Sequence, residues 1–216
     1  MTATPVPAGS SSAKDAVRAA VRARRRARPT DQRGRCALLL AERVLALPEL
    51  GRDHHRRREH AVACYASYGG EPGTGPLIER LHEAGLPVVL PVVGPGRDLH
   101  WASYDGPAAL APGPRGMPEP TGPVIGAGPE ALTTLGVDLL VIPALACDPS
   151  GARLGQGGGF YDTLLAALPR SGPGRILVLA LVHDDEVLAP GAIPVDAHDR
   201  PVDLVVTPTR VLRISG

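Results

Sequence analysis

Aromatic residues are scarce in this sequence of 216 residues, at 3% of the total, whereas hydrophobic residues make up 44%. Alanine, valine and leucine can therefore still form a core large enough for a domain of this length. Glycine (26) and proline (24) are abundant, but at that hydrophobic fraction they do not indicate a disordered chain. Only residues 1–12, rich in Pro, Ser and Gly, are predicted to be a disordered tail. Residues 13–216 are predicted to form a single domain.

A net charge of one sign is also missing, since 23 Lys and Arg residues stand against 22 Asp and Glu residues. No overall field draws the chain to nucleic acid or to a membrane surface, and neither is expected as a partner. No run approaches the roughly 18 apolar residues of a membrane span, and the N-terminus has no apolar core before a small-residue cleavage site. We expect a cytoplasmic monomer.

Cysteine is the third scarce residue type. Cys36, Cys64 and Cys147 lie far apart, are odd in number and form no Cys-x-x-Cys pair. This pattern argues against a disulfide framework and against a structural zinc site. The three thiols are predicted to be buried apolar residues in a reducing compartment.

Short apolar runs that alternate with helical patterns predict the fold. Ser12 is predicted as the N-cap of a first helix that Pro29 ends, and a second helix closes near Pro48. Helices are also predicted at 76–85 and 161–169, and strands at 60–68, 87–93, 99–104, 137–147, 175–182 and 203–214, with the rest of 94–129 as loops. The alternation predicts an α/β, Rossmann-like fold, an open and mostly parallel sheet with helices on both faces.

Two loops that lead from a strand into a helix are candidates for a ligand site, "GGEPGTG" at 69–75 and "RLGQGGGFYD" at 153–162. Ligands of open parallel sheets bind beyond the carboxyl ends of the strands, where such loops gather. The second loop places Gly155, Gly157, Gly158 and Gly159 within five positions. So many glycines indicate positive φ or a close approach of the backbone to a ligand, and the loop N–H groups could hold an anion such as phosphate.

The glycine loop matches neither of the two familiar phosphate-binding motifs. A P-loop needs a Lys and a hydroxyl residue that are absent here, and a dinucleotide fingerprint needs Gly or Ala where Phe160 stands. Its flanking residues are more informative, because Arg153 offers a forked donor to phosphate oxygens and Asp162 could hold a bridging Mg²⁺. The alternative is a mobile loop with Asp162 as the N-cap of the next helix.

The segment "DLLVIPALACDPSGARLGQGGGFYDTLLA" resembles the signature of the 5-formyltetrahydrofolate cyclo-ligase family. Further segments resemble that family in the same order along the chain: "KDAVRAAVRARRRA", "GGEPGTGPLIERLHEAGLPVVLPVV", "GMPEP" and "IPVDAHDRPVDLVVTP". The resemblance implies an enzyme that uses ATP and Mg²⁺ to close 5-formyltetrahydrofolate into 5,10-methenyltetrahydrofolate, with release of ADP and phosphate. Such chemistry requires positioning and charge neutralisation rather than a protein nucleophile.

The resemblance also assigns the nucleotide and metal sites. Lys14 and Arg18, one turn apart on a helix, would reach the ATP phosphates, whereas the run Arg22–Arg28 is predicted to be a solvated basic face, which is also the alternative for Lys14. Asp162 and Asp199 would bind Mg²⁺, and Arg153 and Asp162 would be catalytic. The implied ATP-binding residues are Lys14, Arg18, Arg153, Leu154, Gly155, Gln156, Gly157, Gly158, Gly159, Phe160 and Tyr161.

The substrate side of the site follows from the same resemblance. Glu71 would accept hydrogen bonds from the pterin ring, and Glu119, Pro120 and Trp101 would line the same cleft. Packing in the core is the alternative interpretation for Trp101.

The chain departs from the family pattern at two places. Gln156 and Phe160 stand where family members commonly carry Tyr or Arg and a second Tyr, and Pro72 and Gly73 replace the middle of a Glu-x-x-Thr segment. These departures leave open a relative that keeps the nucleotide site but has altered or lost folate activity. A second alternative is an RNA-associating protein that uses the Arg22–Arg28 cluster.

Overall fold

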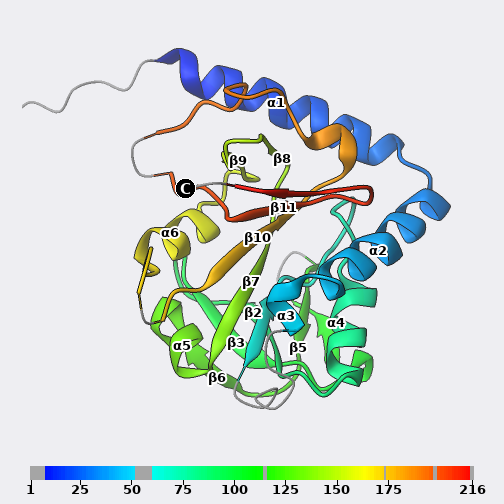
Figure 1. Cartoon of the computed structure of the whole chain (residues 1–216), viewed down its shortest axis with the longest axis vertical. Helices are drawn as coiled ribbons and strands as arrows, with labels where there is room; N and C mark the ends of the chain where they lie inside the picture. The colour runs from blue at the N-terminus through cyan, green and yellow to red at the C-terminus, as the bar shows by residue number, and fades with distance from the viewer. Residues whose placement is uncertain (1–7, 52–59, 114–115, 173, 197–198, 215–216) are drawn as a thin grey trace, which may run out of the picture.

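An eight-stranded sheet forms the centre of the computed structural model, which describes residues 8–51, 60–113, 116–172, 174–196 and 199–214 (Figure 1). The strands lie in the spatial order β12-β11-β10-β7-β1-β2-β3-β6. Their bounds are β1 (Ala61–Cys64), β2 (Val88–Val93), β3 (Leu99–Ser103), β6 (Val124–Ala127), β7 (Val137–Pro143), β10 (Leu177–Leu181), β11 (Leu204–Val206) and β12 (Val211–Arg213).

The central strands of this sheet are parallel. From β11 to β2 each neighbour pairs in parallel, whereas β12, β3 and β6 at the two margins pair antiparallel. This topology confirms the predicted α/β fold with a mostly parallel sheet. Two small antiparallel ladders lie outside it, β4 (Leu110–Pro112) with β5 (Pro118–Pro120) and β8 (Ala146–Cys147) with β9 (Arg153–Leu154).

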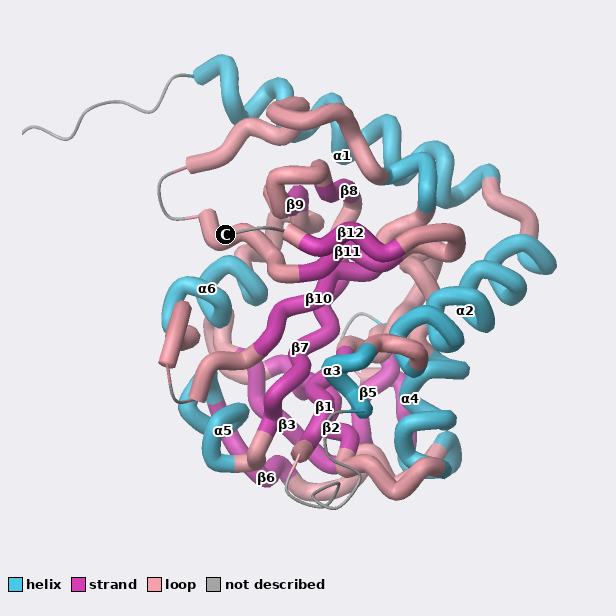
Figure 2. The backbone as a smooth tube through the Cα atoms, viewed as in Figure 1, coloured by secondary structure: helices cyan, strands magenta, loops and turns pink. Residues whose placement is uncertain are grey.

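Helices cover both faces of the sheet, as predicted (Figure 2). The pair α2 (Thr30–Leu45) and α4 (Gly75–Glu83) lies on one face, and α5 (Gly128–Thr134) and α6 (Phe160–Ala167) lie on the other. The long helix α1 (Ala8–Ala27) crosses one end of the molecule, and α3 (Pro48–Gly51) is a single turn. Two further helical turns are η1 (Pro107–Ala109) and η3 (Asp184–Glu186).

The sheet separates two apolar cores, because successive side chains of a strand point to opposite faces. The core beneath α5 and α6 includes Ala63, Ile142, Val178, Leu132 and Leu165. The core beneath α2 and α4 includes Val62, Val141, Leu179, Leu40 and Leu77. The near-continuous apolar composition of the central strands is therefore explained by burial on both sides.

Several predicted boundaries are wrong. The single strand expected at 203–214 is a hairpin of β11 and β12, since Pro208 has no N–H for a ladder and the Thr207 N–H donates to the Arg210 carbonyl (2.9 Å). The strand expected at 137–147 ends at Pro143, after which β8 pairs with β9. Helix α1 begins at Ala8, before Ser12, so the predicted tail overlaps it; residues 1–7 lie outside the described ranges. The region 94–129 also contains β4, β5, β6 and the start of α5.

The prediction that the three cysteines are buried is confirmed for Cys64 and Cys147 and is wrong for Cys36. Cys64 and Cys147 are buried, Cys36 is half-buried, and all three are free thiols. Burial raises the pKa of the Cys147 thiol to about 12, so it is neutral at physiological pH. Within the described ranges, no helix combines the length and the apolar composition that crossing a membrane requires.

Candidate functional site

A cavity of about 500 Å³ lies where the loops after β1 and β7 meet the β2–β3 hairpin. It is lined by the following residues, taken in chain order: Arg22, Tyr65, Ala66, Tyr68, Glu71, Pro91, Val93, Leu99, Met117, Pro118, Glu119, Pro143, Arg153, residues 155–159, Phe160, Tyr161 and Asp162. The structure thus brings together the glycine loop, Arg153, Asp162, Glu71 and Glu119, which are far apart in the sequence. This is the position beyond the strand ends where parallel sheets bind ligands.

The glycine loop connects β9 to α6 along one wall of this cavity. Gly159 is the residue before the helix and has φ of 78°, and Gly157 has φ of 101°, both in the left-handed region that favours glycine. The capping position belongs to Gly159, and no side chain caps the helix, so the alternative role of Asp162 as an N-cap is wrong. Asp162 lies instead in the first turn of α6 and lines the cavity.

Arg153 and Asp162 form an ion pair at the edge of the cavity. The Arg153 side chain is only 5% exposed, whereas that of Asp162 is 47% exposed. The Arg153 Nε atom is buried and has no hydrogen-bond partner within the described part of the chain. An arginine with an unused buried donor beside a glycine-rich backbone can bind an anion, and the accessible carboxylate can bind a cation.

Helix α1 directs Arg18 and Arg22 toward this wall, whereas Lys14 contacts two carboxylates, Asp196 and Asp199, that are not among the cavity-lining residues. Arg18 Nε donates to the Gly155 carbonyl (3.1 Å), and Arg22 donates from Nε to Gln156 Oε1 (3.2 Å) and from Nη2 to the Gln156 carbonyl (2.9 Å). Lys14 Nζ contacts Asp199 Oδ2 (3.5 Å) as well as Asp196 Oδ2 (2.8 Å). The α1 residues predicted from the resemblance therefore contact the loop and the predicted metal-side carboxylate directly.

Lys14 is not a solvated surface lysine. Burial opposes its charged form, but the hydrogen bond to Asp196 and the charges of Asp199 and Asp196 outweigh that effect and raise its pKa. Asp199 Oδ2 also accepts a hydrogen bond from the Asp196 N–H (2.9 Å), which fixes this turn. His198, the neighbour of Asp199 in the family motif, lies outside the described residues.

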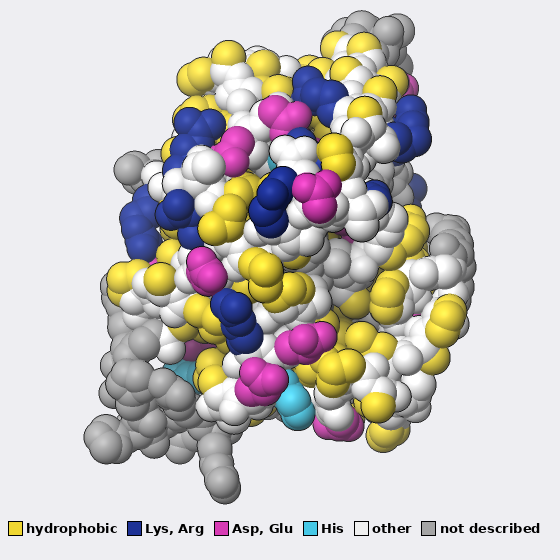
Figure 3. All heavy atoms as spheres, turned by 90° about the vertical axis from the view of Figure 1, so that its right-hand side faces the viewer, with side chains coloured by type: hydrophobic (Ala, Val, Ile, Leu, Met, Phe, Trp, Pro, Cys, Tyr) yellow, Lys and Arg dark blue, Asp and Glu magenta, His cyan; other side chains and the backbone are white. Residues whose placement is uncertain are grey.

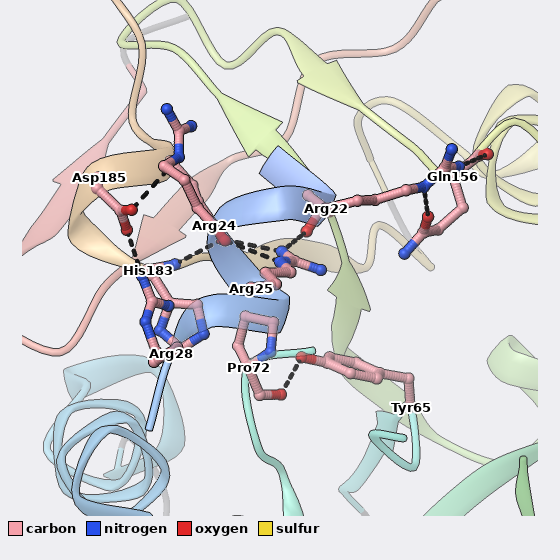
Figure 4. Close-up of polar contacts among 11 residues, drawn as sticks. Arg22, Arg24, Arg25, Arg28, Tyr65, Pro72, Gln156, His183 and Asp185 are labelled. Atoms are coloured by element: carbon pink, nitrogen blue, oxygen red, sulfur yellow. Dashed lines mark hydrogen bonds and ion pairs between the residues drawn. The ribbon is translucent and has the colours of Figure 1, made fainter. Parts of the chain in front are cut away.

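The prediction that Arg22–Arg28 is a solvated basic face is wrong for Arg25, which is buried, and for Arg28, which is half-buried; Arg22, Arg24 and Arg26 are exposed, although Arg22 and Arg24 also have partners (Figure 4). Arg25 is 4% exposed and donates to both carboxylate oxygens of Glu186 (2.7 and 2.8 Å) and to the Ala144 carbonyl (2.5 Å). Arg28 pairs with Asp185 (2.6 Å). Helical periodicity turns Arg18, Arg22 and Arg25 toward the rest of the domain, and the sequence alone did not reveal their acidic partners.

Glu71 lies at the opposite wall, in the turn that follows β1. Its carboxylate accepts the Tyr68 N–H (3.2 Å), and burial raises its pKa, against the opposing effects of that hydrogen bond, the Arg25 charge and a hydrogen bond with Gln156. The departure at Pro72 and Gly73 has a packing explanation. The Tyr65 hydroxyl donates to the Pro72 carbonyl (2.6 Å), and a Cβ on Gly73 would lie 2.7 Å from the Cβ of Ala37 in α2.

The other predicted substrate residues divide into two groups. Glu119 lines the cavity and accepts the Val93 N–H (3.0 Å). Pro120 is buried, and Trp101 is 0% exposed and donates its indole N–H to the Gly128 carbonyl (3.0 Å); neither is among the cavity-lining residues. Trp101 therefore takes the core position that the sequence left open as its alternative. Leu154 is likewise buried, in the small cluster with Ala146.

Sequence reasoning missed several cavity-lining residues, among them Arg22, Tyr65, Tyr68 and Met117. Only Arg22 had a usable signal, because it lies one helical turn after Arg18 on the same face of α1. The others come from loops whose path depends on packing between distant elements.

A sequence model described as the 5-formyltetrahydrofolate cyclo-ligase family matches residues 10–208 of this chain. The 5-formyltetrahydrofolate cyclo-ligase of Mycolicibacterium smegmatis is 39% identical over 155 residues, which cover 69% of this chain and 74% of that protein. The protein of the same name from Escherichia coli K12 is 32% identical over 193 residues, which cover 88% and 98%.

Solved structures agree with this likeness. The NMR structure of Aquifex aeolicus 5,10-methenyltetrahydrofolate synthetase superposes with a TM-score of 0.74 at 28% identity, covering 94% of this chain and 93% of that one. A 5,10-methenyltetrahydrofolate synthetase from Mycoplasma pneumoniae gives a TM-score of 0.64 at 16% identity, covering 94% and 99%, and that similarity concerns the fold alone.

Proposed function

Because this chain belongs to the 5-formyltetrahydrofolate cyclo-ligase family, we propose that it converts 5-formyltetrahydrofolate into 5,10-methenyltetrahydrofolate with MgATP, releasing ADP and phosphate. One observation carries the proposal. A single cavity of about 500 Å³ is lined on one side by the glycine loop with Arg153 and Asp162, and on another by Glu71 and Glu119. Its size suits a small-molecule site, and its two walls suit a phosphate group and a heterocycle.

The residues of the glycine loop fit the phosphates of ATP. Arg153 has a buried Nε without a partner in the described chain, and the glycines carry no side chains that would separate the loop N–H groups from a ligand. When bound, ATP supplies the phosphoryl group that activates the formyl oxygen of the folate. Arg153, Arg18 and Lys14 would neutralise phosphate charge and hold the nucleotide in place, with Tyr161 and Phe160 closing the same wall.

Asp162 and Asp199 are too few to hold Mg²⁺ by themselves. In nucleotide sites, phosphate oxygens and water complete the coordination shell of the metal. Among the described residues there is no group of three or more His, Cys, Asp or Glu side chains able to hold a metal. Asp162 is accessible and lines the cavity, so it is the proposed protein ligand. Asp199 is proposed as a second carboxylate on the metal side, held in position by Lys14.

Glu71 is the proposed acceptor for the pterin ring, and Glu119 a further contact on the substrate side. The Gln156 amide links the two walls, since its oxygen accepts from Arg22 and it also hydrogen-bonds Glu71. Glu71 would thus be held in one orientation by Tyr68 and Gln156 before substrate enters.

The proposed activity is tested by incubating the protein with 5-formyltetrahydrofolate and MgATP and following methenyl absorbance in the near ultraviolet, with ADP measured in parallel. We expect both products in equal amounts, and neither when ATP or Mg²⁺ is omitted. If ATP binds but no methenyl product forms, the alternative of a relative with altered or lost folate activity replaces this proposal.

The RNA-associating alternative finds little support in the structure. Arg24, Arg25 and Arg28 of the cluster pair with Asp185 and Glu186. On the face shown in Figure 3, basic and acidic side chains are interspersed rather than gathered into one basic surface.

A further inference from the structure

Three guanidinium groups lie against alternate glycines of the glycine loop. A Cβ on Gly155 would lie 2.9 Å from Arg153 Nη1, and one on Gly157 would lie 3.9 Å from Arg18 Nε. A Cβ on Gly159 would lie 3.2 Å from Arg97 Nη1 and 3.3 Å from Arg97 Cζ. The glycines therefore leave room not only for a ligand but also for arginines that surround the loop.

Arg97 reaches the loop from a different part of the fold than the other two arginines. It lies in the turn between β2 and β3, where the Gly94 N–H donates to the Asp98 carbonyl (3.0 Å) and the Asp98 N–H to the Pro95 carbonyl (3.1 Å). Val93 and Leu99, at the base of this turn, are paired in the sheet and line the cavity. The hairpin thus holds Arg97 over the glycine loop from the substrate side of the cavity.

Of the three guanidinium groups beside the loop, only that of Arg97 has no carboxylate partner among the described residues. Arg153 pairs with Asp162, and Arg18 pairs with Asp15 (2.7 Å). Arg97 is exposed and, within the described ranges, makes no hydrogen bond or ion pair. It lies beside Gly159, immediately before the N-terminus of α6, where the first backbone N–H groups of the helix have no partner within the helix.

We infer that Arg97 is a further nucleotide-binding residue, whose guanidinium donates to phosphate oxygens of a nucleoside triphosphate held at the amino end of α6. This inference rests on the proposed function, because it requires ATP in the same cavity. A planar guanidinium with several donors suits phosphate oxygens, and binding of the phosphates would join the β2–β3 hairpin to the glycine loop. Arg97 would therefore act on nucleotide affinity and leave folate affinity to Glu71 and Glu119.

The test is calorimetric binding of MgATP, MgADP and 5-formyltetrahydrofolate to the wild-type protein and to Arg97→Ala and Arg97→Lys. The matched control is Arg35→Ala, which removes the same charge from an exposed residue of α2 that pairs with Asp31. We expect Arg97→Ala to raise the Kd of MgATP roughly tenfold to a hundredfold, Arg97→Lys to raise it less, and the Kd of the folate to stay unchanged.

The possible outcomes distinguish failure of the Arg97 role from failure of the proposed function. If the wild-type protein binds MgATP and Arg97→Ala binds it as tightly as Arg35→Ala does, the role of Arg97 is refuted and the proposed function stands. If the wild-type protein does not bind MgATP, both are refuted. Equal loss of nucleotide and folate binding in Arg97→Ala, with an unchanged melting temperature, would assign Arg97 to the shape of the cavity rather than to phosphate.

Discussion

Asp162, the proposed protein ligand of Mg²⁺, is also the ion-pair partner of Arg153. About half of its side chain is nonetheless exposed to the cavity. An arginine that is paired before the ligand arrives is held in one rotamer, and the carboxylate keeps a free oxygen for a cation.

Replacing this carboxylate tests the metal role. We expect Asp162→Asn and Asp162→Ala to lower turnover by orders of magnitude and to shift the Mg²⁺ concentration needed for half-maximal rate upward. The measurement is the rate of methenyl formation as a function of Mg²⁺, with Asp31→Asn in α2 as the control. Near-normal turnover with the wild-type Mg²⁺ dependence would refute the assignment.

The negative charge of Glu71 is unfavourable to the folded state, because burial opposes it. Burial raises its pKa above that of an ordinary carboxyl group, so the folded state binds the proton more tightly than the unfolded state does. Stability is therefore lost, not gained, as pH rises from the ordinary carboxyl pKa of about 4.3 through the raised value.

The neutral isostere makes this cost measurable. We expect Glu71→Gln to be more stable than the wild type at pH 7 and equal to it near pH 3.5, below both pKa values, while its folate binding weakens. Urea unfolding of both proteins at a series of pH values gives the difference. A stability difference that does not change with pH would mean that the charge of Glu71 is not the cause.

At the scale of elements, α1 is held by a row of cations rather than by an extensive apolar face. Lys14, Arg18, Arg22, Arg25 and Arg28 each contact a residue in the second half of the chain. The pair of Arg25 and Glu186 is the most buried of these contacts, with side chains 5% and 0% exposed. Breaking such a pair leaves a buried charge without a partner, which is costly even where the intact pair adds little.

This contrast predicts a specific mutational pattern. We expect Arg25→Met to lower the free energy of unfolding by about 3–5 kcal/mol, because the Glu186 carboxylate stays buried. Adding Glu186→Gln should recover part of that loss, since the amide oxygen can still accept the His183 N–H. Urea denaturation measures both variants.

The exposed pair of Arg35 with Asp31, at 72% and 69% exposure, provides the control. Arg35→Met should change the free energy of unfolding by less than about 1 kcal/mol. Equal effects of Arg25→Met and Arg35→Met would show that the buried pair does not anchor α1.

An element could be predicted from the sequence where the residues that cause it lie within one segment of the chain. The apolar runs of β1, β2, β7 and β10 identified their strands, because burial on both faces requires such runs. The hairpin at Pro208 was missed although its proline was visible, and the ladder of β8 with β9 was missed because it depends on a pairing between separate segments. The acidic partners of α1 were unpredictable for the same reason.

At the scale of the whole molecule, the sequence predicted the residues of the glycine-loop wall of the cavity better than those of the opposite wall. The glycine loop is one continuous segment, so its position after a strand and before a helix could be inferred from the sequence. Arg22 from α1, Met117 near β5 and Arg97 above Gly159 reach the same region only through the tertiary arrangement. Trp101 was predicted for the cleft but is enclosed in the core, because β3 turns that side chain toward α5.

Ligand binding should stabilise the whole domain by mass action. At concentrations near 100 times its Kd, MgATP should add about 2.7 kcal/mol and raise the melting temperature by about 5–10 °C, and 5-formyltetrahydrofolate should do the same on its own. Differential scanning calorimetry measures both shifts, with ATP plus excess EDTA as the comparison. A chain that melts at one temperature under all these conditions would have neither site.

The contacts of α1 have a consequence for the order in which the protein is made. Their partners lie 119 to 185 residues further along the chain, from Ala144 to Asp199. During synthesis α1 therefore leaves the ribosome well before these partners, and it cannot complete its contacts until they have followed. A chain that ends before Asp185 lacks the carboxylate partners of both Arg25 and Arg28, so helix α1 cannot form its most buried ion pair.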